Sequence, residues 1–212
     1  MNSISPNLNI MIKASEKASK VLIRDFGEVE KLQVSLKGPN NFVTNADRKV
    51  EDIIIKELEK SKKNFSILTE ESGFIENSDK DNFWIIDPID GTTNFLNGVP
   101  HFCISIALLI NNEITAGVIY DPIKDEMFFA EKNNGSYLNN KSIRVSKKNK
   151  IADCLYGVNF REDIPENLII RNTGSAALDL AYVSSGRFDG SLQKNVNLWD
   201  IAAGTILIKE AG

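Results

Sequence analysis

Two aspartates, Asp87 and Asp90, stand three residues apart around Pro88 and are followed by Gly91-Thr92-Thr93. Carboxylate oxygens held in a stiff loop are ligands that a hard cation such as Mg²⁺ prefers. The glycine and threonines that follow can present backbone N–H groups to an anion. A cation site beside an anion cradle indicates chemistry on a phosphate ester, because the cation neutralises the phosphate and activates water.

The acids also have simpler explanations. Asp-Pro and Asp-Gly are ordinary turn dipeptides, although turns alone explain the whole run 87–93 poorly. Glu70 and Glu71 follow a predicted strand, and Asp200 opens a predicted helix. A Glu-Glu pair is commonly solvated surface, and an acid in a first helical turn commonly just offsets the helix dipole. The case for a metal site therefore depends on these acids occurring together with the aspartate loop.

Hydrophobic patterns predict the elements that position these acids. Residues 83–86 are apolar and β-branched and predict a buried strand, which Pro88 should end. Helices are predicted at 8–26, with Gly27 as cap, and at 44–58, 174–185 and 199–209. Further strands are predicted at 32–36, 65–68, 103–110, 114–120, 126–131, 155–160 and 188–192, with loops at 37–41 and 111–112.

This mixture of helices and strands lacks strict alternation and predicts an α+β fold. An Asn-, Lys- and Ser-rich linker running to about Lys150 divides the chain into two expected lobes. Residues 1–150 would form an N-terminal α+β lobe with most metal ligands. Residues 151–212 would begin a C-terminal α/β lobe that carries the Trp199-Asp200 pair.

Composition narrows the function further. The 212 residues are 42% hydrophobic and carry a net charge of −4, which argues against a nucleic-acid scaffold. Neither a signal peptide nor a membrane-length apolar run is evident, so a cytoplasmic protein without membrane contact is expected. His101 is the only histidine, which disfavours a histidine triad or a His-rich zinc site. Cys103 and Cys154 could form a disulfide, but buried reduced thiols are favoured.

Five segments of the chain resemble the inositol monophosphatase family, within the fructose-1,6-bisphosphatase-like superfamily. In the family's order they are residues 43–47, 69–72, 87–95, 174–177, and 199–204 continuing to 210–212. The resemblance implies a layered αβαβα sandwich of the sugar phosphatase type with the site between two lobes. It implies hydrolysis of small phosphorylated polyols, foremost inositol-1-phosphate, by water activated by two to three Mg²⁺ ions. It also implies a homodimer that Li⁺ inhibits.

The resemblance assigns roles residue by residue. The metal ligands that it implies are Glu70, Asp87, the carbonyl of Ile89, Asp90 and Asp200. The catalytic residues that it implies are Glu70, Thr92 and Asp47, the last two orienting the attacking water. The substrate-binding residues that it implies are Ile89, Asp90, Gly91, Thr92, Thr93, Ser175, Ala176, Gln193 and Asp200.

Two departures from the family pattern limit what it implies. Many members carry a glutamate six residues before the tryptophan of the Trp-Asp pair, where this chain has Gln193. A neutral amide leaves the metal site untouched but weakens the case for inositol. Members also continue beyond the position of Gly212, so the C-terminal part is expected to be incomplete. The apolar helix at 199–209 would then be partly uncovered.

Two alternatives to an inositol-1-phosphate phosphatase stay open. One is another sugar or nucleotide phosphatase of the superfamily, acting on fructose-1,6-bisphosphate, histidinol phosphate or adenosine bisphosphate. The other is a phosphatase-like scaffold that binds a partner without turnover.

Overall fold

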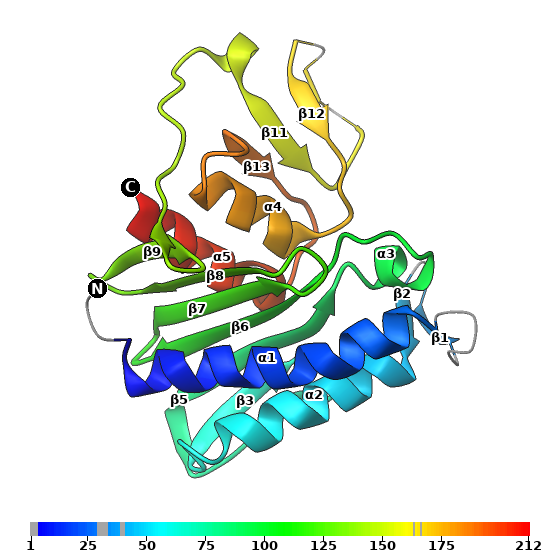
Figure 1. Ribbon diagram of the computed structural model, residues 1–212, viewed down its shortest axis with the longest axis vertical. Helices are drawn as coiled ribbons and strands as arrows, with labels where there is room; N and C mark the ends of the chain where they lie inside the picture. Colours follow the sequence, from blue (N-terminus) through cyan, green and yellow to red (C-terminus); the bar gives the residue numbers. More distant parts are fainter. Residues whose placement is uncertain (1–3, 29–33, 39–40, 163, 166) are drawn as a thin grey trace.

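Four stacked layers of secondary structure make up the molecule (Figure 1). Helices α1 (Pro6–Phe26) and α2 (Asn45–Leu58) form the first layer, and helices α4 (Ala176–Ser184) and α5 (Leu198–Ala211) the third. An eight-stranded sheet lies between these helix layers, and a three-stranded sheet covers α4 (Figure 1). The computed structural model describes the chain over residues 4–28, 34–38, 41–162, 164–165 and 167–212.

The eight-stranded sheet is mixed, with the strand order β10-β9-β8-β7-β6-β5-β3-β4. Strands β3 and β5 pair in parallel, and the other described neighbours pair antiparallel. Its strands are β3 (Phe65–Thr69), β4 (Gly73–Ile75), β5 (Asp79–Asp90), β6 (Cys103–Ile110), β7 (Glu113–Asp121), β8 (Glu126–Glu131), β9 (Gly135–Leu138) and β10 (Lys141–Ser142).

The smaller elements complete the fold. Strand β11 (Leu155–Val158) pairs in parallel with β12 (Ile169–Arg171) on one side and β13 (Gly190–Leu192) on the other. Strands β1 (Val34–Gly38) and β2 (Asn41–Thr44) form an antiparallel pair just before α2. The remaining elements are the short helix α3 (Thr92–Leu96) and a 3₁₀ turn at Ile151–Asp153.

Both faces of the main sheet are covered, which explains its long apolar strands. Trp84 and Ile86 on β5 pack toward α1 and α2, and Ile85 between them packs toward α4 and α5. Ile106 and Ala107 on β6 divide between the two faces in the same way. Since successive side chains of a strand point to opposite faces, two covered faces require a continuous apolar run.

Helix α5 lies tightly on the main sheet. Gly117 on β7 has no room for a Cβ against Ala203 and Ile206 of the helix. Ile206 is 1% exposed and Leu207 is fully buried, while the side chains at positions 201 and 208 are half-buried. The helix is therefore covered at Ile206 and Leu207, contrary to the expectation, whereas Ile201 and Ile208 remain partly exposed.

Most of the predicted elements are confirmed. Helices α1, α4 and α5 and strands β3, β6, β7, β8, β11 and β13 lie within a few residues of their predicted bounds. Asn111 and Asn112 both take positive φ angles, 50° and 63°, as a tight hairpin turn requires. Gly27 caps α1 with φ −68°, so this position does not use the left-handed freedom of glycine. Leu32 and the loop residues Pro39 and Asn40 lie outside the described residues.

Some elements differ from the prediction. Strands β2, β4, β9, β10 and β12 and helix α3 were not predicted, and β9 and β10 occupy the supposed linker before residue 150. The predicted loop at 37–41 is wrong at Lys37, Gly38 and Asn41, which lie in β1 and β2. The division at residue 150 stays a prediction. The core between the main sheet and α4 and α5 contains residues from both sides of it.

The described layers nevertheless have the α, β, α, β order of the expected sandwich, and the α+β class is confirmed. Among the described residues, no helix is both long enough and apolar enough to cross a bilayer.

Candidate active site

Three carboxylates from two elements meet at one end of the main sheet. Asp87 and Asp90 come from the last residues of β5, and Asp200 comes from the first turn of α5. One oxygen of each lies within 4.8 Å of the others. Asp87 is 1% exposed and Asp90 is 8% exposed, so these two acids are held inside the protein, and Asp200 is half-buried.

A bulge at Pro88 brings the two strand aspartates together. Asp87 lies opposite Ser105 and Asp90 opposite Cys103, so three steps along β5 match two steps along β6. In a regular strand, residues three apart point to opposite faces of the sheet, and the extra residue of a bulge reverses this. The prediction that Pro88 ends the strand is wrong, because a bulge tolerates a residue without an N–H.

The two oxygens of Asp90 have different tasks. Its Oδ2 accepts hydrogen bonds from the Ser175 hydroxyl and, at 2.8 Å, from the backbone N–H of Ala177. The Cys103 thiol also approaches Oδ2, at 3.8 Å. Ser175 is the N-cap of α4, so this carboxylate receives the positive end of the helix. The hydrogen bonds that the structure describes for Asp90 use Oδ2, which leaves Oδ1 for a cation.

The site concentrates negative charge. Burial raises the pKa of Asp87 well above its ordinary value, and neighbouring carboxylates, Glu70 first among them, raise it further. Burial also raises the pKa of Asp90 to about 6, against the lowering effect of the hydrogen bonds from Ser175 and Ala177.

Asp200 shares this environment, and burial raises its pKa to about 6. Its Oδ2 accepts the N–H of Asn197 at 2.6 Å, which fixes the carboxylate at the start of α5. None of the three aspartates takes part in an ion pair with the lysines and arginines that the structure describes. A hard divalent cation fits this donor set, because it would offset the like charges that the protein leaves facing one another.

Glu70 lies beside this group rather than within it. It follows β3, and its N–H donates to the carbonyl of Ile86 at 3.2 Å, one residue before Asp87. It is not one of the three acids whose oxygens share the 4.8 Å limit, but its charge acts on both Asp87 and Asp90. Its place next to Asp87 is thus shown, and its ligand role stays a prediction.

The structure brings together the residues expected to orient water. The Thr92 hydroxyl donates to the carbonyl of Ile89 at 2.9 Å and lies 3.5 Å from Oδ1 of Asp47. Asp47 is 1% exposed in the first turn of α2. Thr92 opens α3 after Gly91, whose φ is 95° and where a Cβ would meet the His101 carbonyl at 3.0 Å. Only glycine makes this turn without strain.

The expected substrate wall lies in the C-terminal part of the chain. Ser175 is 3% exposed and points its hydroxyl at Asp90, and Ala176 is half-buried at the first position of α4. Gln193 follows β13, and its Nε2 donates to Asp179 at 2.9 Å and to Ser191 at 2.8 Å. Contacts of Ser175, Ala176, Gln193 and Thr93 with a substrate stay predictions.

Sequence reasoning gave no role to three further residues of this region, Asn94, Gly174 and Glu51. Asn94 donates to the carbonyls of His101 and Thr173, at 2.7 and 2.8 Å, and so joins α3 to the segment before α4. Gly174 has a φ of 83°, and a Cβ there would lie 2.9 Å from Asn94. Glu51 of α2 is 2% exposed and binds the loop after β3. The only sequence signal for Glu51 was a charged residue next to Val50 on the apolar face of a predicted helix.

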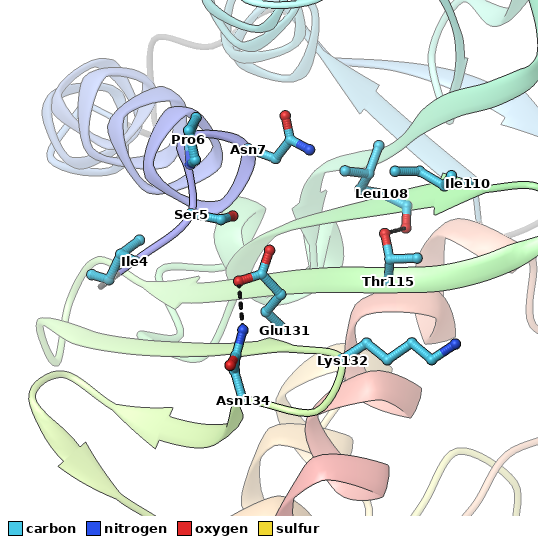
Figure 2. Close-up of a pocket in the computed structure, with 10 residues that line it drawn as sticks. All are labelled: Ile4, Ser5, Pro6, Asn7, Leu108, Ile110, Thr115, Glu131, Lys132 and Asn134. Atoms are coloured by element: carbon cyan, nitrogen blue, oxygen red, sulfur yellow. Dashed lines mark hydrogen bonds between the residues drawn. The ribbon is translucent and has the colours of Figure 1, made fainter. Parts of the chain in front are cut away.

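Two other features are separate from the cluster. Cys103 and Cys154 are buried free thiols, as expected. A hollow of about 720 Å³ lies at the N-terminus of α1 (Figure 2), where Leu108, Ile110 and Lys132 help to line it. Leu108 and Ile110 belong to the far end of β6 and Lys132 directly follows β8, whereas the carboxylates lie beside the start of β6. This hollow is therefore not part of the carboxylate site.

Comparisons with known proteins agree with this geometry. The inositol monophosphatase family pattern matches residues 4–212. An inositol-1-monophosphatase of Mesorhizobium japonicum is 47% identical over 220 residues, covering 97% of this chain and 83% of that protein. A Nus factor SuhB of Pasteurella multocida is 42% identical, covering 99% and 84%.

A solved structure provides the same agreement at the level of the fold. The extragenic suppressor protein SuhB of Bartonella henselae superposes with a TM-score of 0.93 at 45% identity, covering 98% of this chain and 86% of that one. With the whole described core and the carboxylate cluster inside the matched region, this chain belongs to the inositol monophosphatase family.

Proposed function

We propose that this protein is a Mg²⁺-dependent phosphatase that hydrolyses small polyol phosphate monoesters, foremost inositol-1-phosphate. The observation that carries the proposal is the group formed by the buried Asp87 and Asp90 and the half-buried Asp200, in which one oxygen of each lies within 4.8 Å of the others. Such a group is costly to leave unneutralised, since burial raises the pKa of each of its members. A divalent cation bound to these oxygens would offset their charge and would in turn bind an anionic substrate.

Each residue of the site has a task in this reaction. The three aspartates, with Glu70 and the Ile89 carbonyl, would hold two to three Mg²⁺ ions. Bound Mg²⁺ supplies charge neutralisation and a more acidic water. Thr92 and Asp47 hold a hydrogen-bonding position for the attacking water, since Thr92 is already oriented by the Ile89 carbonyl at 2.9 Å. The N–H groups of residues 91–93 would bind the phosphate oxygens.

Substrate preference would depend on the residues that face the polyol rather than on the metal ligands. Gln193 would face the polyol, and a neutral amide recognises a hydroxyl less strongly than a carboxylate does. Fructose-1,6-bisphosphate, histidinol phosphate and adenosine bisphosphate are therefore the competing substrates.

A panel assay decides among these substrates. Phosphate release is measured from inositol-1-phosphate and from the three competing esters, in Mg²⁺ and in EDTA. We expect turnover in Mg²⁺ only, fastest with inositol-1-phosphate. Release in EDTA would refute metal dependence, and a faster competing ester would refute the substrate.

A second candidate function is partner binding without turnover. Its support is the 42% identity with a protein named as a Nus factor. The intact set of acids favours the enzyme, and the assay above separates the two, because a scaffold would release no phosphate from any ester.

The family also leads us to propose a cytoplasmic homodimer that is inhibited by Li⁺ and binds neither nucleic acid nor membrane. Light scattering gives the mass, and activity in LiCl against matched NaCl isolates the lithium effect. A monomeric mass or full activity in LiCl would refute the corresponding part.

A further inference from the structure

Three hydrogen bonds from the loop after β3 converge on one side chain of α2, that of Glu51. Its Oε2 accepts the Thr69 hydroxyl at 2.5 Å and the backbone N–H of Glu71 at 3.1 Å. Its Oε1 accepts the hydroxyl of Ser72. Glu51 is 2% exposed, and Thr69 is fully buried. A glutamate inside the protein thus serves the loop as a hydrogen-bond acceptor.

The residue enclosed by these contacts is Glu70. Its two neighbours in the chain, Thr69 and Glu71, both bind the same oxygen of Glu51. Its own N–H is bound to the Ile86 carbonyl of β5, next to Asp87. The backbone of Glu70 is therefore held from α2 on one side and from β5 on the other, which restricts where its carboxylate reaches.

Helix α2 places a second group at the same site. Asp47 and Glu51 are one turn apart, so they lie on the same side of the helix. Asp47 reaches Thr92, and Glu51 reaches the loop that carries Glu70. One rigid helix thus sets the distance between the water-orienting pair and the fourth acid.

We propose that Glu51 is a positioning residue that holds Glu70 at the cation site. This inference rests on the proposed function, since it gives Glu51 a part in Mg²⁺ binding. Among the described residues Glu51 forms no ion pair, so hydrogen bonds rather than a counter-charge compensate its burial. What the loop requires from position 51 is then an acceptor of the correct length and not a negative charge.

Glutamine can meet that requirement. Its carbonyl oxygen would accept the two bonds now made to Oε2, and its NH₂ would donate to Ser72, because a hydroxyl also accepts. Glu51→Gln therefore keeps the loop in place, whereas Glu51→Ala removes all three contacts. Ile54→Ala is the matched control, because Ile54 is fully buried on the same helix and packs in the apolar core.

The experiment measures Mg²⁺ affinity by calorimetry and amide exchange of residues 69–73 by mass spectrometry, on the full chain. For Glu51→Ala we expect a dissociation constant raised by roughly 10–100-fold, the range typical when residues that orient a metal ligand are lost. Amide protection of the loop should fall with it. The Mg²⁺ dissociation constant of Glu51→Gln should stay within about threefold of wild type, because glutamine keeps the contacts that orient the loop. Ile54→Ala should melt earlier while keeping its Mg²⁺ affinity.

Each contrary result has a distinct meaning. Unchanged Mg²⁺ affinity in Glu51→Ala, with wild type binding normally, overturns the positioning role alone. A Glu51→Gln protein as weak as Glu51→Ala also overturns it, since charge would then be the requirement. An equal loss in Ile54→Ala would reduce the effect to general destabilisation and overturn it too. A wild-type protein that binds no Mg²⁺ overturns the proposed function together with this role of Glu51.

Discussion

Asp90 lies against the first turn of α4 and Asp179 belongs to that turn, and the two buried carboxylates have different surroundings. Burial raises the pKa of both, to about 6 for Asp90 and about 7 for Asp179. Asp90 stands among other carboxylates, whereas Asp179 accepts hydrogen bonds from two neutral donors, Thr173 at 2.7 Å and Gln193 at 2.9 Å.

The difference separates two functions of the site. The region around Asp90 leaves like charges facing one another, which a cation would offset. The carboxylate of Asp179 is instead bound by neutral donors of the protein. Gln193, where the family resemblance leads us to expect a glutamate, is one of these donors. The chain thus departs from the family pattern where substrate would be recognised and not where the cation would be bound.

The largest expected effect comes from Asp90→Asn. The asparagine carbonyl can replace Oδ2 toward Ser175 and Ala177, so the helix contact survives while an NH₂ group faces the cation. We expect turnover to fall by about 10³-fold, since metal stabilisation is worth several kcal/mol. Phosphate release and the melting temperature are measured, with Asp81→Asn at the exposed far end of β5 as control. An active Asp90→Asn enzyme would remove the distinction between the two regions.

Thr92→Ala should lower kcat by about 10²-fold with little change in KM, because orienting a reacting water is worth that much or more. Thr92→Ser keeps the hydroxyl and should restore most of the rate. Steady-state kinetics on both variants provide the measurement. A change in KM alone would place Thr92 with the phosphate cradle instead.

Asp179→Asn tests the region around Asp179 through the pH dependence of its stability. A carboxyl whose pKa is raised by folding favours the native state while protonated. Wild type therefore loses stability relative to the variant as pH rises from about 4, its ordinary pKa, to about 7. The relative gain of the variant above pH 7 should be on the order of 2–4 kcal/mol. Chemical unfolding at pH 5 and pH 8 measures it.

A control of opposite sign is available at Asp189, directly before β13. Burial tends to raise the pKa of Asp189, but hydrogen bonds with Ser146, Leu155 and Lys148 hold it at about 2. Wild type should thus hold an advantage over Asp189→Asn above about pH 4 and lose it as pH falls toward 2. Equal pH profiles for the two variants would contradict the comparison.

The smallest expected effect comes from Gln193→Glu. The new carboxylate would lie against Oδ2 of Asp179, where Nε2 now donates at 2.9 Å. Selectivity for inositol-1-phosphate over glycerol-2-phosphate should rise by roughly tenfold or less, since a charged acceptor adds about one kcal/mol to a hydrogen bond. The double variant with Asp179→Asn should retain the gain without the added repulsion. An unchanged kcat/KM ratio in both would show that position 193 does not touch substrate.

The sequence predicted the covered strands well and the short ones poorly. Strands β6 and β7 could be read because two covered faces require long apolar runs. Strands β4, β10 and β12 have three, two and three residues, and they exist because a neighbour offers backbone partners. The prediction that Pro88 ends its strand failed for a related reason. Pairing with β6 on both sides of the bulge outweighed the tendency of proline to end a strand.

The site was predictable where chemistry lies in a compact motif. Asp87 and Asp90 could be found because they are three residues apart in the chain. Glu51 and Asn94 could not, because their meaning depends on partners 18 to 21 and 79 residues away. Side chains that act through such distant contacts leave no local pattern, and a single sequence therefore does not reveal them.

The division of labour within Asp90 has a thermodynamic consequence. Asp90 holds α4 through Oδ2, and a cation bound to its other oxygen would share the same rigid carboxylate, so the two interactions would be linked. Such linkage is reciprocal: if cation binding stabilises α4 in its native position, then that position of α4 increases the affinity for the cation by the same free energy. Because the three-stranded sheet packs on α4, removing the cation with a chelator should increase amide exchange in β11 to β13 more than in β7 and β8. A bound ion would therefore also stabilise the packing of the two sheets through α4.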